Sequence, residues 1–303
     1  MAAERYAGSV SHVDTPLIRF PRTLEEAWEK KQENGVDASY IAGGTVIQMQ
    51  RGQGHPYPPV LISLETIEGL KGITIRGDYL EIGPLTTLEA CRRSPLLQQH
   101  APCLVEALMS AAAPAVRNRG TIGGNIMYGK GDTLPALLVL DASVSFFDNS
   151  GLQSLPLLSF VNKGENTPDL LSGIKIPFPT DGERMISFFK KTGRREAFSL
   201  SVINAAGRLM LDEEEKVAGV RLAAGGGNVL PQRLTEAEDT LRGEMLSTNK
   251  LRNLHETLAA SFHPSGDPYC SGSYKQKAAA YMILSYLYEN MEQSLVKGRV
   301  EDA

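Results

Sequence analysis

The chain has 303 residues, a formal net charge of −4 and a hydrophobic fraction of 42%, enough for a sizeable core and two or three domains. This charge balance argues against a nucleic-acid-binding surface, and three scattered cysteines argue against a disulfide framework or a four-thiolate metal site. Neither a signal peptide nor a membrane span is recognisable, so we expect a cytoplasmic protein.

Short helices and strands are expected to alternate in the first half of the chain. Thr23 can cap a helix, because its hydroxyl can accept a hydrogen bond from the first turn, and Gly35 can end that helix. The further elements expected here are strands over 39–42, 60–64, 72–75 and 79–82, and helices over 45–50, 88–91 and 102–113. An apolar run over 134–140 then ends at Asp141-Ala142.

In the second half, strands come before helices, which is the order of an α+β domain. Strands are expected over 144–147, 170–177, 184–190, 202–211 and 218–224, and helices over 235–242, 248–262 and 274–291. Prolines and a glycine over 177–182 indicate a domain boundary between the earlier and later parts of this pattern.

Two glycine-rich loops are the most informative feature of the sequence. The first loop, Ala42-Gly43-Gly44-Thr45, joins a predicted strand to a predicted helix, and the second loop runs from Arg117 to Asn125. Neither contains the lysine of a Walker loop or the pattern GxGxxG, and either loop alone is more often a simple turn. Glycines let backbone N–H groups approach a ligand closely, so the two loops together predict a pyrophosphate site with neutral donors.

The second loop and the residues after it resemble the FAD-binding subunits of the molybdenum hydroxylases, the group of xanthine dehydrogenase and carbon monoxide dehydrogenase. The similarity continues through Asp132, Pro135 and an apolar run to Asp141-Ala142. The first loop is similar to that family's first FAD motif. Further similarities lie in Leu170-Leu171 before 174–177, in Phe189, Lys191, Arg195 and Ala197, and in Gly225 to Arg233, so the resemblance covers almost the whole chain.

The resemblance implies an α+β fold in two parts. The first is an FAD-binding domain of the PCMH (vanillyl-alcohol-oxidase-like) type over 12–180, with subdomains of about 12–58 and 59–180. The second is a C-terminal α+β domain over 184–292, of the CO dehydrogenase flavoprotein type, with a small sheet and helices.

The resemblance also implies which residues hold FAD. Residues 42–47 are expected to bind the pyrophosphate at a helix N-terminus, and the second loop to add the N–H groups of Gly123, Gly124 and Asn125 and the hydroxyl of Thr121. The complete expected set is Ala42, Gly43, Gly44, Thr45, Val46, Ile47, Thr121, Gly123, Gly124, Asn125, Asp132, Leu171 and Lys191.

Three members of this set have alternatives. Asp132 is expected to accept a hydrogen bond from a ribose or ribityl hydroxyl, or else to cap the helix before Leu134. Leu171 is expected to pack on a ring of the cofactor, or else to be an ordinary core residue. Lys191 is the expected cation beside the isoalloxazine, where it would favour the reduced flavin, although Lys190 leaves an ambiguity of one residue.

By resemblance, the chain is an electron-transfer subunit. Electrons are expected to come from 2Fe-2S clusters on a small partner subunit and to pass through FAD to NAD or another acceptor, while a large partner subunit carries molybdopterin and hydroxylates a substrate, with a purine as in xanthine dehydrogenase as first candidate. No metal site is expected on this chain. The alternatives are a stand-alone FAD-dependent oxidoreductase of the same fold and a scaffold subunit that has lost FAD.

Three departures from the family pattern bear on these expectations. Val46 stands where the family has Asp or Asn, which removes one side-chain contact and is the feature that favours the scaffold alternative. The segment between Asn125 and Asp132 lacks the usual proline, and Ser199 replaces an aspartate.

Overall fold

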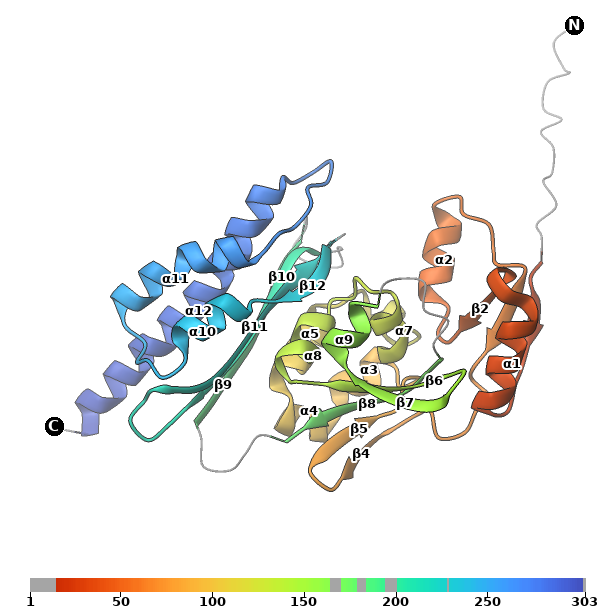
Figure 1. Cartoon of the computed structure of the whole chain (residues 1–303), viewed down its shortest axis with the longest axis horizontal. Helices are drawn as coiled ribbons and strands as arrows, with labels where there is room; N and C mark the ends of the chain where they lie inside the picture. Colours follow the sequence, from red (N-terminus) through yellow and green to blue (C-terminus); the bar gives the residue numbers. More distant parts are fainter. Residues whose placement is uncertain (1–14, 164–169, 179–183, 194–200, 228, 302–303) are drawn as a thin grey trace, which may run out of the picture.

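The structure is a computed structural model that describes residues 15–163, 170–178, 184–193, 201–227 and 229–301, with side chains up to Met291. It contains three separate sheets with helices packed between and around them (Figure 1). The expected domain ends at 12 and 180, most of the boundary over 177–182, and Arg195, Ala197 and Ser199 lie outside the described residues.

The first sheet is small and parallel, with the order β1-β3-β2. Thr23 caps α1 (Leu24–Asn34) by accepting from the amide of Glu26, and Gly35 follows at φ 52°, as the sequence predicts. The sheet is formed by β1 (Leu17–Arg19), β2 (Ala38–Ile41) and β3 (Val60–Ser63), and α2 (Thr45–Gly52) follows β2 directly. The first loop is therefore the connection from β2 to α2.

The second sheet is antiparallel, with the order β4-β5-β8-β6-β7, and it carries a group of short helices. Its strands are β4 (Ile73–Arg76), β5 (Tyr79–Ile82), β6 (Ser143–Asp148), β7 (Gly151–Pro156) and β8 (Leu170–Pro177). The helices are α3 (Leu88–Arg93), α4 (Pro95–His100), α5 (Pro102–Ser110), α6 (Pro114–Arg117), α7 (Ile122–Met127), α8 (Leu134–Val139) and α9 (Leu157–Val161).

The third sheet is antiparallel, with the order β12-β11-β10-β9, and is followed by three helices. Its strands are β9 (Arg184–Gly193), β10 (Ser201–Leu211), β11 (Val217–Gly226) and β12 (Val229–Arg233), and the helices are α10 (Thr235–Leu241), α11 (Thr248–Ser261) and α12 (Gly272–Glu301). This is the expected order of strands first and helices later.

Both faces of the third sheet are covered, which joins the two halves of the chain. Side chains alternate across a strand, so Phe188 enters the core formed with α10–α12, whereas Phe189 enters the core formed with α5 and α8. Figure 1 shows this arrangement, with α10–α12 on the outer face of the sheet and the short helices on the inner face. Residues of the C-terminal part therefore reach the helices beside the second loop.

The sequence prediction was wrong at the end of the helix over 102–113. Helix α5 ends at Ser110, Ala112 adopts a φ of 46°, and Pro114 occupies the first turn of a new helix, α6. Proline suits that position because its missing N–H has no partner in a first helical turn. Strands β1, β7 and β12 were also not predicted, because they are short and contain few large apolar residues that end up buried.

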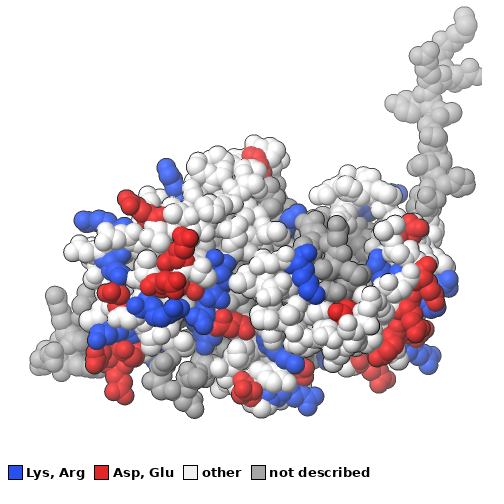
Figure 2. Space-filling model, in the orientation of Figure 1, with Lys and Arg blue, Asp and Glu red and all other residues white. Residues whose placement is uncertain are grey.

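The surface carries charges of both signs. Acidic and basic side chains are interspersed over most of the face in Figure 2, and acidic ones gather at the end where the glutamate-rich α1 lies. Among the described residues, no helix is both long and apolar enough to cross a membrane, and no group of three or more potential metal ligands occurs.

Candidate FAD site

The two glycine-rich loops lie directly against each other. A Cβ atom on Gly43 would be 1.8 Å from the carbonyl oxygen of Arg119, and one on Gly120 would be 3.3 Å from Oγ1 of Thr45. Only a residue without a side chain lets the two backbones approach this closely. The structure thus brings together two loops that are far apart in the sequence.

The first loop presents a row of free backbone donors. Gly44 precedes α2 at φ 71°, with no side-chain cap, and the first amide to donate along this stretch is that of Gln48, to the carbonyl of Gly44 at 3.0 Å. No described residue accepts a hydrogen bond from the amides of residues 43–47. A helix N-terminus with unpartnered amides attracts anions through both hydrogen bonds and the helix dipole.

The second loop contributes differently from the expectation. The amides of Gly123, Gly124 and Asn125 already donate to protein atoms, namely the carbonyl of Pro84 at 2.9 Å, the Thr121 hydroxyl at 3.0 Å and the Thr121 carbonyl at 3.0 Å. These three amides therefore already have protein partners in this structure, and their contact with the cofactor stays a prediction. They are used because Ile122–Met127 is a short helix, α7, with Thr121 as its cap.

The second loop still offers hydrogen-bond donors on two of its side chains. The Thr121 oxygen accepts from Gly124, and no described residue takes its hydroxyl proton. The Asn125 carbonyl oxygen accepts from the Thr133 hydroxyl at 2.6 Å and from its amide at 3.3 Å, while no described partner is bonded to the side-chain nitrogen. A hydroxyl donor and an amide donor of the second loop therefore have no described acceptor.

Gly124 differs from the other loop glycines. Local geometry explains why glycine stands at three of these positions. A Cβ on Gly43 would clash with the backbone of Arg119, a Cβ on Gly123 would be 2.6 Å from Pro84, and Gly44 has a positive φ. Gly124 has ordinary backbone angles, and a Cβ there would meet the Thr121 hydroxyl at 3.1 Å and no other atom within 4 Å outside its chain neighbours and its own helix backbone. This open space beside a glycine, in the loop that packs against the start of α2, fits the close approach of a cofactor backbone.

Asp132 and Lys191 form a buried ion pair across the two halves of the chain. The Lys191 Nζ lies 2.7 Å from Oδ2 of Asp132, with side-chain exposures of 10% and 14%. The other carboxylate oxygen of Asp132 accepts from the Ser201 hydroxyl at 2.7 Å and from Nδ2 of Asn204 at 3.2 Å. The side chain of Asp132 does not cap α8, whose cap position is Thr133, so the helix-cap alternative was wrong.

The structure separates Lys191 from Lys190. Successive residues of β9 face opposite sides, and Nζ of Lys190 lies over the ring of Tyr286 in α12, 5.8 Å from its centre. Lys191 instead reaches Asp132 and the carbonyl of Ser110 at 3.0 Å. Of the two lysines, Lys191 is therefore the one beside the segment that follows the second loop.

Leu171 is a core residue in this structure. It is 4% exposed on β8, opposite Phe146 in the register with β6, and belongs to the core between the second sheet and its helices. This matches the alternative of an ordinary core leucine.

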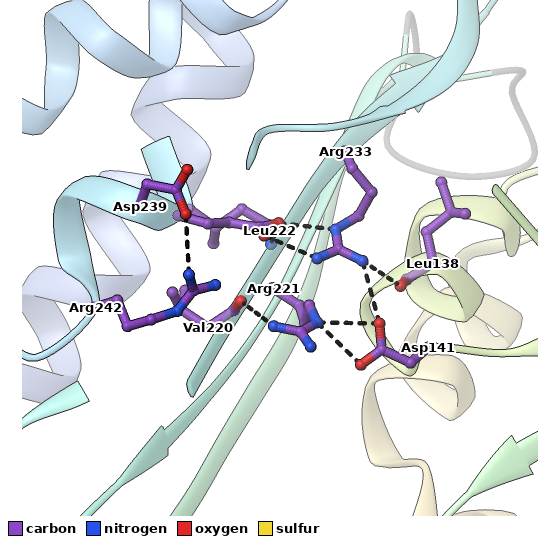
Figure 3. Close-up of polar contacts among 9 residues, drawn as sticks. Leu138, Asp141, Val220, Arg221, Leu222, Arg233, Asp239 and Arg242 are labelled. Carbon is purple, nitrogen blue, oxygen red and sulfur yellow. Dashed lines mark hydrogen bonds and ion pairs between the residues drawn. The ribbon is translucent and has the colours of Figure 1, made fainter. Parts of the chain in front are cut away.

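A second polar contact joins the same two halves, and the sequence prediction gave it no role (Figure 3). Asp141, at φ 52° after α8, receives Nε of Arg221 at 2.9 Å and Nη1 of Arg233 at 3.2 Å. Arg233 also makes a two-pronged contact with Glu238, both bonds being 2.8 Å, and Glu238 accepts from the amide of Leu222. Asp141 was noted in the sequence as part of the family pattern, and the structure shows it as a link between domains.

The whole chain is similar to known flavoprotein subunits. Residues 14–179, more than half of the chain, match the family described as FAD binding domain in molybdopterin dehydrogenase, and residues 187–290 match the CO dehydrogenase flavoprotein C-terminal domain. The nicotine 6-hydroxylase medium subunit of Paenarthrobacter nicotinovorans is 26% identical over 90% of this chain and 97% of its own length.

Other relatives and solved structures agree. The xanthine dehydrogenase FAD-binding subunit of Escherichia coli O157:H7 is 28% identical over 80% of this chain and 84% of its own length. A chain of carbon monoxide dehydrogenase from Hydrogenophaga pseudoflava has the same fold, with a TM-score of 0.83, 24% identity, and coverage of 90% of this chain and 96% of that one. The chain therefore belongs to the FAD-binding medium subunits of the molybdenum hydroxylase family.

Proposed function

We propose that the two loops hold the pyrophosphate of FAD, with the amides of residues 43–47 as its principal donors. The observation that carries this proposal is the row of unpartnered amides at the start of α2, packed against the second loop. A pyrophosphate is doubly charged and needs several donors when it is buried. The amide of Val46 serves this role as well as that of Asp or Asn, so the substitution at this position removes a side-chain contact and leaves the backbone site intact.

Side chains in the second loop and after it orient the rest of the cofactor. Thr121 and Asn125 have a hydroxyl proton and an amide nitrogen to offer, and Gly124 leaves room for the chain between them. Asp132 holds the Lys191 side chain in place, and we assign Lys191 as the cation that favours the reduced flavin. When bound, FAD supplies the ability to exchange single electrons and hydride, which no side chain of this chain possesses.

We further propose that the chain works in a complex with a molybdopterin-binding large subunit and a 2Fe-2S small subunit. Electrons would enter from the clusters of the small subunit and leave to NAD. The relatives named for nicotine, nicotinate and xanthine support an aromatic nitrogen heterocycle as the substrate of the complex, with a purine as the first candidate. That substrate would bind on the large subunit.

The experiment uses this chain purified in complex with its proposed large and small partner subunits. Xanthine is added under anaerobic conditions and the flavin absorbance is followed; NADH is added to a second sample. Bleaching by both would support the purine substrate and the NAD acceptor. Two further samples receive dithionite and nicotinate. Flavin bleaching by dithionite but not by NADH would contradict NAD as the acceptor. Bleaching by nicotinate but not by xanthine would contradict a purine as the substrate.

A further inference from the structure

The turn between α5 and α6 is strained and lies beside Lys191. Ala112 has a φ of 46°, in the left-handed region that residues other than glycine rarely adopt. A backbone in such a conformation persists only where its surroundings hold it there. The turn therefore needs an anchor.

Arg117, at the start of the second loop, is that anchor. Its guanidinium donates through Nη1 to the carbonyl of Ala111 at 3.0 Å and to that of Ala112 at 2.7 Å. Its Nε donates to Oε2 of Glu89 at 3.1 Å, and the residue is only 9% exposed. A planar guanidinium can make these three bonds at once, whereas a lysine ammonium of similar reach cannot reproduce their geometry.

Glu89 is itself fixed by further arginines. Hydrogen bonds from Arg92 and Arg93, together with that from Arg117, hold the pKa of the Glu89 carboxyl well below its usual range, so the group is ionised at neutral pH. No described hydrogen bond joins the side chain of Arg92 or Arg93 to the turn. The Glu89 carboxylate thus orients Arg117, and of these three arginines Arg117 is the one with described hydrogen bonds to the turn.

The turn begins at a residue that Lys191 contacts. The carbonyl of Ser110 accepts from Nζ of Lys191 at 3.0 Å, and the only other described partner of that ammonium is Asp132. A shift of the turn would move one of the two groups that define where the lysine charge sits. Arg117 is therefore connected through the turn to the ammonium, without touching it.

We propose that Arg117 is a positioning residue, which holds the strained turn so that the Ser110 carbonyl fixes the Lys191 ammonium and thereby the reduction potential of the flavin. This inference rests on the role proposed above for Lys191. It gives the arginine of the second loop a function other than contact with the cofactor.

The test is the flavin reduction potential of the FAD-loaded chain in four variants: Arg117→Lys, Lys191→Met, the double variant, and Arg92→Lys. Arg92→Lys is the matched control, because Arg92 bonds to the same carboxylate but not to the turn. We expect Arg117→Lys to lower the potential by less than Lys191→Met does, Arg92→Lys to leave it unchanged, and the double variant to equal Lys191→Met alone.

The outcomes separate this inference from the proposed function. An unchanged potential in Lys191→Met would remove the role of the lysine itself. A shift in Lys191→Met with none in Arg117→Lys, or an Arg117→Lys shift that persists at full size in the Lys191→Met background, would overturn the positioning role alone.

Two further variants cover the case in which Arg117→Lys does not fold or load FAD. Glu89→Gln keeps the shape of the side chain but weakens the anchor, and it is expected to lower the potential in the same direction. Adding Ala112→Gly should restore the potential in either variant, because glycine adopts a positive φ without the anchor. A lowered potential that Ala112→Gly leaves unrestored would contradict the link through the turn.

Discussion

Helix α8 has one aspartate before it and another after it, and basic side chains of the third sheet contact both. The two contacts differ in burial and in the number and type of basic side chains. Asp132, before the helix, pairs with a single lysine in buried surroundings. Asp141, after the helix, is 41% exposed and faces two arginines. The first contact lies beside the second loop, and the second lies at the far end of the helix.

The choice of cation in each contact fits its position. The guanidinium of Arg233 binds Glu238 and Asp141 at the same time, which suits a clamp between domains (Figure 3). An ammonium is a compact charge that can be shared between a carboxylate and a carbonyl, as Lys191 is. The comparison indicates that the Asp141 contact holds the domains together, whereas the Asp132 contact places a charge.

The largest expected effect on stability follows from Asp132→Ala. Removing the carboxylate leaves Lys191 buried without its partner, which costs about 3 kcal/mol of unfolding free energy for a buried pair. Urea unfolding of the purified chain measures this loss. A loss of less than about 1 kcal/mol would mean that the pair is solvated and behaves like an exposed one.

Lys191→Ala is expected to act on the flavin. Removing the cation should lower the reduction potential of bound FAD, by about 30 mV for each 1.4 kcal/mol of lost stabilisation of the two-electron reduced form. Lys190→Ala is the matched control, because the neighbouring lysine faces Tyr286, and its potential should equal that of the unaltered chain. Equal shifts in both variants would point to a general charge effect.

Asp141→Ala is expected to have a smaller effect, about 0.2–1 kcal/mol, because the carboxylate is partly exposed and Arg233 keeps its contact with Glu238. The flavin potential should not change. A changed potential in this variant would break the distinction between the two ends of α8.

The last expected effect is on the pH dependence of stability and concerns a third pair, Asp267 with the fully buried Lys275. The hydrogen bond from Lys275, with those from the amides of Tyr269 and Cys270, lowers the pKa of Asp267 to about 2. A depressed pKa stabilises the fold above the ordinary value of the group, and that stabilisation is lost as the pH falls from about 4 through about 2. Acid titration of stability should therefore be less steep in Asp267→Asn, and an unchanged slope would contradict the assignment.

Much of the fold could be predicted from the sequence, because local signals are strong where they agree with the final contacts. The Thr23 cap, the glycine at the end of α1, and the order of strands and helices after residue 184 are examples. The end of α5 was missed because a run of alanines favours a helix locally, whereas the observed turn depends on Arg117, which a local signal does not show.

The candidate site could be predicted in its residues but not in its contacts. The glycines of both loops were recognisable, yet the use of the Gly123 amide by Pro84 is a tertiary contact with no local pattern. The pairing of Asp132 with Lys191 joins residues on different domains, and the family resemblance indicated a role for each residue but not their contact with each other. The two arginines at Asp141 were likewise visible only after the third sheet was in place.

The measurement that tests the central claim most directly is the flavin content of Gly124→Val compared with Gly52→Val. Both glycines lie in helices with ordinary backbone angles and nearly empty surroundings, but only Gly124 belongs to one of the two glycine-rich loops. We expect both variants to fold, Gly52→Val to keep its FAD, and Gly124→Val to bind FAD at least about a hundredfold more weakly, equivalent to about 2.8 kcal/mol. A folded Gly124→Val variant with undiminished FAD would contradict the placement of the cofactor between the two loops.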